Sequence, residues 1–461
     1  MENLDFSRIH RFHFDDLNIL LDVNSGSVHL IDQPTWDFLD YLVVNPFETA
    51  FSLMTEQYDY DTATAVVDDL ATLMQAGQLF SDAPELEGFV THTEPIVKAM
   101  CLHMAHDCNL RCGYCFADTG AYHGKRSLLS LETGKKALDF LIKASKHRKH
   151  IEVDFFGGEP LLNFKVCQQL VEYGKEQGKL HDKIFKFTLT TNGVLLTPEV
   201  QDWMNKEGIS AVLSLDGRKE VHDFMRQFPN GKGSYDAIVQ NFKDLVAKRN
   251  GEEYFLRGTY THYSTDFAAD VAHIYDLGFR SISMEPVVAP AEFAHALTDE
   301  DVFKACKEYD KLARHYWSKY EAGDPYSFFH FNVDLTGGPC LPKRLCGCGA
   351  GHDYLAVSPE GDLYPCHQFV GEEEYKVGTV DTGIVNPELC AEFAKSNVLS
   401  KEECMRCWAR FYCSGGCHAN NIRYGGSLTQ PYEKGCTMQK KRLECAIGLQ
   451  VKKALAEQEE N

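Results

Sequence analysis

Three cysteines within eight residues are the strongest chemical signal in this 461-residue chain. Cys108, Cys112 and Cys115 follow a predicted strand with C-x3-C-x2-C spacing. A tetrahedral zinc site needs four ligands, so three thiolates could form part of a structural zinc site. Three thiolates on a [4Fe–4S] cluster leave one iron open to a substrate or cofactor. The aromatic Tyr114 lies just before the last of the three cysteines.

A second concentration of cysteines lies in the C-terminal part of the chain, which we call the tail. Eleven of the 17 cysteines fall there, between Cys340 and Cys445. Seven of them follow the pattern C-x12-G-x4-C, then C-x2-C-x5-C-x3-C, then one more cysteine. These seven are Cys348, Cys366, Cys404, Cys407, Cys413, Cys417 and Cys436. A pair of zinc ribbons is the competing interpretation, because C-x2-C pairs suit zinc. Either interpretation predicts metal binding rather than disulfides.

The middle of the chain must position the first cysteine group, and there strands alternate with helices. Six strands are predicted, over residues 98–105, 151–156, 184–190, 210–215, 254–261 and 281–287. Strands joined by helices imply a parallel sheet, either an open doubly wound sheet or a barrel. Small polar or acidic residues follow three of these strands, at the end where barrel enzymes build their sites. They are Gly157, Gly158, Glu159, Pro160, Thr191, Asn192, Ser214 and Asp216, and Arg257 lies on the fifth strand.

The first 85 residues, which we call the head, contain no cysteine and form a predicted small unit. It comprises strands at 18–23 and 27–31 around the turn at 24–26, then helices at 35–41 and 62–76. A hairpin followed by helices is the make-up of a winged-helix unit. The second helix contains Asp68 and Asp69 and no Lys or Arg, which disfavours DNA binding. An exposed hairpin edge can instead accept a peptide as an added strand.

Composition limits the partners and the location of the protein. The 46 basic and 67 acidic residues give a formal charge of −21, which argues against charge-driven nucleic-acid binding. No apolar run approaches the roughly 20 residues of a membrane span. The acidic start, Met1 to Asp5, lacks the basic and apolar parts of a signal peptide. We therefore expect a cytoplasmic protein, in which thiols stay reduced and are available to metals.

The loop that contains Cys108, Cys112 and Cys115, called the cysteine loop below, and the segment Phe156–Pro160 together resemble the motifs of the radical S-adenosylmethionine (SAM) superfamily. That resemblance implies an α/β fold with a partial (β/α)6 barrel, in which Cys108, Cys112 and Cys115 hold the catalytic [4Fe–4S] cluster. The implied SAM contacts are Tyr114 at the adenine, Gly157, Gly158, Glu159 and Pro160 at the amino group, Thr191 and Asn192 at the third strand end, Ser214 and Asp216 near the carboxylate or ribose, and Arg257 at the carboxylate. For Tyr114, a purely structural role in packing is an equal interpretation. For Arg257, a surface ion pair is the alternative interpretation.

The spacing in the tail resembles the SPASM domain, an extension that holds two auxiliary [4Fe–4S] clusters. On that pattern Cys404, Cys407, Cys413 and Cys436 ligate auxiliary cluster II, and Cys348, Cys366 and Cys417 ligate auxiliary cluster I. The motif supplies no fourth ligand for cluster I. Either Cys346 or Cys340 completes it, or one iron stays open for a substrate thiol. The implied cofactors are SAM and three [4Fe–4S] clusters.

The whole chain resembles the SCIFF peptide maturases, on residues 104–108, 116–120 and 153–160. The implied domains are a winged-helix-like precursor-peptide recognition domain (1–90), a radical SAM barrel (91–300), a bridging helical region (301–339) and a SPASM domain (340–461). The implied reaction is an intramolecular thioether crosslink in a short cysteine-rich ribosomal peptide, started when a 5′-deoxyadenosyl radical abstracts hydrogen from an acceptor carbon. The head would bind the peptide leader, and a flavodoxin- or ferredoxin-type protein would donate single electrons.

Three other functions remain compatible with the motifs. A SPASM maturase could oxidise a Cys or Ser side chain to formylglycine, which needs a positioned general base in the barrel. A related enzyme could form a carbon–carbon crosslink in a peptide. A non-enzymatic iron–sulfur redox or sensory protein could use the head on DNA, although the acidic charge disfavours this.

Overall fold

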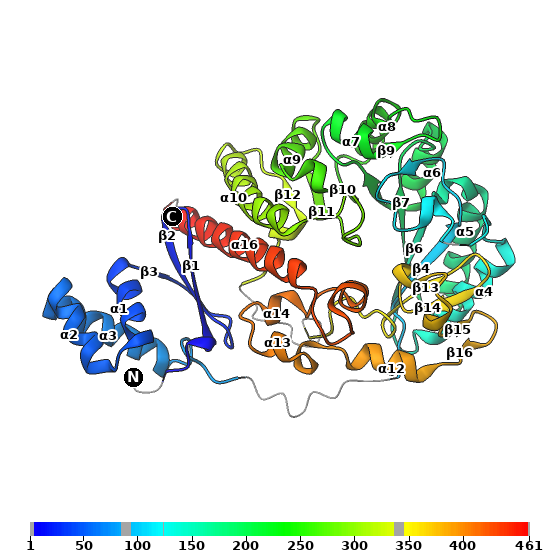
Figure 1. The fold of residues 1–461 in the computed structure, drawn as a ribbon. Helices are drawn as coiled ribbons and strands as arrows, with labels where there is room; N and C mark the ends of the chain where they lie inside the picture. The colour runs from blue at the N-terminus through cyan, green and yellow to red at the C-terminus, as the bar shows by residue number, and fades with distance from the viewer. Residues whose placement is uncertain (1–3, 84–93, 123, 336–344, 460–461) are drawn as a thin grey trace.

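A large sheet forms the centre of the protein, in line with the predicted alternation of strands and helices. The computed structural model describes residues 4–83, 94–122, 124–335 and 345–459. Six parallel strands lie side by side in the order in which they occur in the chain (Figure 1). They are β4 (Ala99–Ala105), β6 (His150–Gly157), β7 (Ile184–Thr191), β8 (Ser210–Ser214), β10 (Tyr254–Tyr260) and β11 (Ser281–Pro286). Each strand lies within one residue of its predicted bounds, so all six predictions are confirmed.

The strand order distinguishes a barrel from a doubly wound sheet. A doubly wound sheet reverses its strand order at a switch point, whereas each strand here pairs with the one before it. The sheet stays open in the described residues, because β12 (Ser327–Phe328) pairs with β11 at one side and β13 (Tyr354–Val357) with β4 at the other. Beyond β13 the antiparallel strands β14 (Asp362–Tyr364), β15 (Gly378–Thr379) and β16 (Gly383–Ile384) extend the sheet. The fold is therefore the expected partial barrel.

Helices cover the outer face of this sheet. They are α4 (Leu131–Ala144), α5 (Phe164–Leu180), α6 (Pro198–Glu207), α7 (Lys219–Met225), α8 (Tyr235–Lys248), α9 (Phe267–Asp276) and α10 (Asp299–Glu321). Side chains alternate along a strand, so Met100 and Leu102 of β4 join the core under the helices while Cys101 and His103 face the inside. Polar residues therefore collect on the inner face.

The head contains a three-stranded antiparallel sheet and three helices. They are β1 (Ile9–Phe14), β2 (Leu17–Asp22), β3 (Val28–Ile31), α1 (Gln33–Val44), α2 (Phe47–Gln57) and α3 (Tyr60–Gln75). The predicted hairpin corresponds to β2 and β3, and the predicted helices correspond to α1 and α3. Neither β1 nor α2 was predicted. β1 pairs with the whole of β2, and its polar His10 stacks on Trp408 with ring centroids 3.9 Å apart, so distant contacts stabilise it.

The tail is built from short elements and one long helix. They are α12 (Pro387–Lys395), α13 (Glu402–Met405), α14 (Arg410–Cys413), α15 (His418–Asn420) and α16 (Glu433–Glu459). The predicted hairpin before Cys366 is confirmed as β13 and β14. The helix α16 packs against α10 and also contacts β1 of the head (Figure 1). The predicted boundaries near 90 and 340 lie outside the described residues. Among the helices that the structure does describe, none has the length and apolar character needed to cross a membrane.

Candidate functional site

The loop after β4 brings Cys108, Cys112 and Cys115 into electrostatic contact. Burial, with smaller contributions from nearby Glu159 and the other two thiols, raises the pKa of the Cys108 thiol to about 12. The Cys108 sulfur accepts hydrogen bonds from the Leu110 backbone N–H, at 3.4 Å, and from Asn192 Nδ2, at 3.6 Å. The three thiols therefore share one largely buried space, where a bound cation would favour their deprotonated form.

Gly157 and Gly158 allow the next loop to pack directly on the cysteine loop. The N–H of Gly158 donates to the Ala105 carbonyl at 2.8 Å, and that of Glu159 donates to the Asp107 carbonyl at 2.9 Å. A Cβ at position 158 would lie 2.0 Å from the Asp107 oxygen, so only glycine fits without a shift. The close backbone approach that the glycines allow is thus to the protein's own cysteine loop.

Glu159 ties the ends of β6 and β7 together. Its carboxylate accepts hydrogen bonds from Leu161 N (3.1 Å), Thr191 Oγ1 (2.8 Å) and Asn192 N (2.9 Å), and the residue is fully buried. Burial raises the pKa of Glu159 to about 7 despite these hydrogen bonds. Pro160 begins the short helical turn that follows. The structure thus brings the predicted residues together, and the protein's own donors already engage the Glu159 carboxylate.

Asp216 anchors the cysteine loop to the end of β8. Its carboxylate accepts hydrogen bonds from Tyr114 Oη (2.6 Å), Arg226 Nε (3.0 Å) and Thr259 N (2.9 Å). Arg226 also pairs by its backbone with Cys112, in a two-stranded bridge between β5 (Arg111–Cys112) and β9 (Arg226–Gln227). The sequence analysis missed Arg226. A buried carboxylate requires a cationic partner, and that requirement was the available signal.

Ser214 and Arg257 face each other across β8 and β10 on the inner side of the barrel. Arg257 is exposed, and its guanidinium makes no hydrogen bond or ion pair with the residues that the structure describes. Glu285 on β11, by contrast, contacts His330 Nε2 at 2.7 Å and Arg442 at 3.7 Å. These neighbours, together with Arg257, hold the pKa of Glu285 well below its usual range. Arg257 is therefore available to bind an external anion.

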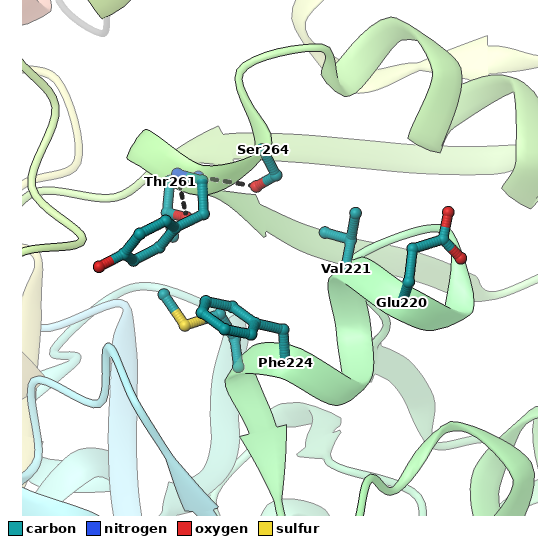
Figure 2. A pocket seen from close by; sticks show the side chains of 7 residues that line it. Glu220, Val221, Phe224, Thr261 and Ser264 are labelled. Atoms are coloured by element: carbon teal, nitrogen blue, oxygen red, sulfur yellow. Dashed lines mark hydrogen bonds between the residues drawn. The ribbon is translucent and has the colours of Figure 1, made fainter.

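A cavity of about 320 Å³ opens between α7 and the turn that follows β10 (Figure 2). Phe224 and Tyr263 are about half exposed here, with ring centroids 5.0 Å apart in an edge-to-face arrangement. Met225 also lines the cavity, and its carbonyl accepts the N–H of Gly113 at 2.8 Å. The cavity is thus largely apolar and adjoins the cysteine loop.

Four thiols of the tail form one interacting group. They are Cys404, Cys407, Cys413 and Cys436. Burial, with smaller contributions from the other three members, raises the pKa of the Cys436 thiol to about 12. The backbones of Gly416 and Gly415 hydrogen-bond to the Cys413 sulfur, which favours its thiolate. The group has the membership predicted for cluster II, and ligation itself stays a prediction.

A separate group contains Cys348, Cys366 and Cys417. Burial raises the pKa of the Cys366 thiol, and Cys417 and Cys348 raise it further. Cys348 and Cys417 are exposed. Cys346 instead packs with Leu345, Val398 and Phe411, next to Cys404, and its thiol interacts with Asp353. Cys340 lies outside the described residues. The structure therefore groups the three thiols predicted for cluster I and leaves the fourth ligand as a prediction.

The cysteine loop provides donors that fit a bound sulfur cluster with SAM. Asn109 Nδ2 is buried and has no hydrogen-bond partner in the described part of the chain, so it requires an acceptor such as a cluster sulfide or a SAM carboxylate. Hydrogen bonds to the Cys108 sulfur are of the kind that tune iron–sulfur sites. Within the described ranges, no three or more His, Cys, Asp or Glu side chains are arranged to hold a metal ion. A four-iron core lies between its ligands and holds them farther apart than one ion does.

Comparison with known proteins agrees with this site. Residues 98–240 match the family model described as a 4Fe-4S single cluster domain. The radical SAM cyclopropyl synthase TigE of Paramaledivibacter caminithermalis is 22% identical over 440 residues, which cover 87% of each protein. The cysteine-type anaerobic sulfatase-maturating enzyme of Clostridium novyi is 24% identical over 340 residues, covering 68% of this chain and 86% of the enzyme.

Solved structures share the fold. The structure of native anSMEcpe with bound AdoMet and Kp18Cys peptide has a TM-score of 0.65 at 21% identity, covering 78% of this chain and 99% of that chain. Streptococcus suis SuiB bound to precursor peptide SuiA has a TM-score of 0.51 at 18% identity, covering 95% of this chain and all of that chain. The chain is therefore similar over most of its length to radical SAM maturases, and its residues 98–240 match a 4Fe-4S single cluster domain.

Proposed function

We propose that this protein forms an intramolecular thioether between a cysteine sulfur and a carbon of an acceptor residue in a short cysteine-rich ribosomal peptide. The observation that carries the proposal is the three-thiol group of Cys348, Cys366 and Cys417. Two of its members are exposed, and the third, the buried Cys366, also interacts with the buried Cys101 of β4. A cluster on three thiolates keeps an iron open, and a substrate thiol that binds there loses its proton.

The proposed cofactors and the residues of the chain have separate roles in the reaction. Cys108, Cys112 and Cys115 would hold a [4Fe–4S] cluster that, with SAM, supplies the one-electron chemistry for hydrogen abstraction from carbon. Arg257 would bind the SAM carboxylate, because it is the exposed cation on the inner face of β10. Glu159 holds the cysteine loop through its backbone N–H to the Asp107 carbonyl, and Asp216 holds it through Tyr114. Overall, the substrate would lose a hydrogen atom from carbon to the SAM-derived radical, a proton from the thiol, and one electron, which an auxiliary cluster would accept.

The head supports binding of the peptide leader. The strand β3 is at one edge of the head sheet, whose order is β1-β2-β3, and its Leu30 is 49% exposed. An edge strand presents unpaired backbone groups that can bind an extended peptide. The solved structure of SuiB contains its precursor peptide SuiA, which supports the same class of partner here. A single-electron donor of the flavodoxin or ferredoxin type completes the proposed reaction.

A second candidate reaction is oxidation of a Cys or Ser side chain to formylglycine. Relatives named cysteine-type and serine-type anaerobic sulfatase-maturating enzymes support it. Such a reaction needs a general base, and Asp154 on β6 is suitable, because burial and Glu152 raise its pKa to about 6. The protein therefore contains a residue for either reaction, and the product distinguishes them.

Mass spectrometry of the product tests the proposal. The substrate is a small cysteine-rich peptide encoded beside the gene, incubated with the enzyme, SAM and a reductant. We expect a loss of two hydrogens that protects one cysteine from alkylation, and no reaction with Cys108→Ala. The Asp154→Asn variant should keep thioether formation. A loss of two hydrogens that leaves every thiol open to alkylation, and that Asp154→Asn abolishes, contradicts the thioether and supports oxidation.

A further inference from the structure

A buried lysine lies between the two cysteine groups of the tail. Lys401 is fully buried, and its Nζ donates to the Gly415 carbonyl at 2.8 Å. Gly415 belongs to the three-residue link between Cys413 of one group and Cys417 of the other. A Cβ at Gly415 would lie 2.9 Å from Lys401 Nζ and 3.3 Å from its Cδ, so the lysine packs directly on this link.

The ammonium group of Lys401 has few hydrogen-bond acceptors. It carries three N–H donors, and among the described residues it makes one hydrogen bond, to Gly415. Asn421 Nδ2 donates to the same carbonyl at 3.0 Å, so that oxygen is shared. A buried cation with one neutral acceptor is costly unless anions lie nearby. The site therefore requires negative charge in its surroundings.

Cysteine sulfurs from both groups provide that charge when they are deprotonated. Lys401 interacts with Cys404, Cys413 and Cys436 of one group and with Cys348 of the other. Two arginines also interact with these thiols, Arg442 with Cys413 of one group and Arg423 with Cys366 of the other. Lys401 is thus a single cation that faces both groups.

We propose that Lys401 is the electrostatic partner shared by the two auxiliary clusters, and that its charge sets both of their reduction potentials. The inference rests on the proposed ligation of clusters by these cysteines. A reduced cluster carries one more negative charge than its oxidised form, so a nearby cation stabilises the reduced state and raises the potential.

The test uses the full chain with Cys108, Cys112 and Cys115 changed to alanine, so that only the tail can carry iron–sulfur clusters. Iron content and EPR-monitored redox titrations are measured for this parent and for Lys401→Met and Lys401→Arg in the same background. We expect both auxiliary potentials to shift to more negative values in Lys401→Met and to stay near the parent values in Lys401→Arg, which keeps the charge.

Lys440→Met is the matched control. Lys440 is exposed on α16 and its charge lowers the pKa of Cys436, so it lies near one cysteine group only. Solvent screens an exposed charge, so we expect a smaller shift that is confined to one cluster. An equal shift of both clusters in this control contradicts the special position of Lys401.

The outcomes separate the inference from the proposed ligation. A parent without iron in the tail overturns the cluster assignment itself. A parent with both clusters, whose potentials stay unchanged in Lys401→Met or shift for one cluster only, overturns the inference. Loss of iron in Lys401→Met with retention in Lys401→Arg supports it, because a cation is then needed to hold the clusters. Loss of iron in both variants overturns it, because the shape of the lysine rather than its charge is then required.

Discussion

At the scale of single residues, burial determines which partners the charged side chains of the site contact. The sequence predicts that Glu159 and Asp216 contact SAM, and the structure surrounds both carboxylates with donors from the protein itself. Their positions at strand ends were predictable from the pattern of the chain. Their partners were not, because Asn192 and Arg226 reach them only after the strands have paired. Arg257, another predicted contact, makes no hydrogen bond or ion pair with the described residues, and its charge interacts with Glu285.

A pH-dependent stability follows from Glu159. Its pKa is raised from 4.5 to about 7 in the folded protein, so the folded state binds this proton more tightly than the unfolded state does. The resulting stabilisation is complete below pH 4.5 and is lost as the pH rises through 7. At 1.36 kcal/mol per pKa unit, the free energy of unfolding should fall by about 3 kcal/mol over this window.

Glu159→Gln tests this dependence, because glutamine does not titrate. Urea unfolding of the cluster-free protein should show a difference between wild type and variant that changes in favour of the variant as the pH rises from 4.5 to above 7. Parallel pH profiles for the two proteins would show that Glu159 keeps an ordinary pKa in the folded state.

At the scale of elements, the loops after β4 and β6 act as one unit. The cysteine loop has no regular structure of its own beyond β5, and backbone hydrogen bonds from Gly158 and Glu159 hold it. The sequence predicted both loops, since each follows a predicted strand. The sequence did not predict that the loop after β6 holds the cysteine loop in place through these backbone hydrogen bonds.

Gly158→Ala should therefore disturb the cysteine loop. The new Cβ would lie 2.0 Å from the Asp107 oxygen, and overpacking of this kind costs about 1–3 kcal/mol. We expect lower iron content in a variant chain that retains only the Cys108, Cys112 and Cys115 site, together with reduced stability to urea. Gly124→Ala is the control, because its nearest atom would lie at 3.5 Å. Equal iron content in both variants would contradict this role of Gly158.

At the scale of the whole molecule, α16 connects the tail to the head. Gly448 of α16 packs on the ring of Phe14 in β1, and Glu444 contacts His10 at 3.0 Å. Lys452 pairs with Asp15 at 3.0 Å, next to the same strand. The head is thus held against the C-terminal helix by residues more than 400 positions away in the chain.

Gly448→Ala should loosen this contact, because its Cβ would lie 2.2 Å from the Phe14 ring. We expect the variant to lose about 1–3 kcal/mol of stability and to release the head more readily under limited proteolysis. Phe14→Ala removes the obstructing ring, so the double variant should be more stable than the sum of the two single effects, by about 0.5–3 kcal/mol. Strict additivity would place Gly448 outside the contact.

The sequence by itself determined the features that depend on local order. The alternation of strand and helix patterns predicted the six barrel strands to within one residue, and the resemblance of the cysteine spacing to the radical SAM and SPASM patterns predicted the three thiol groups that the structure brings together. Both patterns are properties of neighbouring residues, so they can be read along the chain. The tertiary structure alone decided the open barrel order, the partners of Glu159 and Asp216, the strand β1, and the place of Lys401. These depend on contacts between segments far apart in the chain, whose pairing is set by burial in the folded protein rather than by any local pattern.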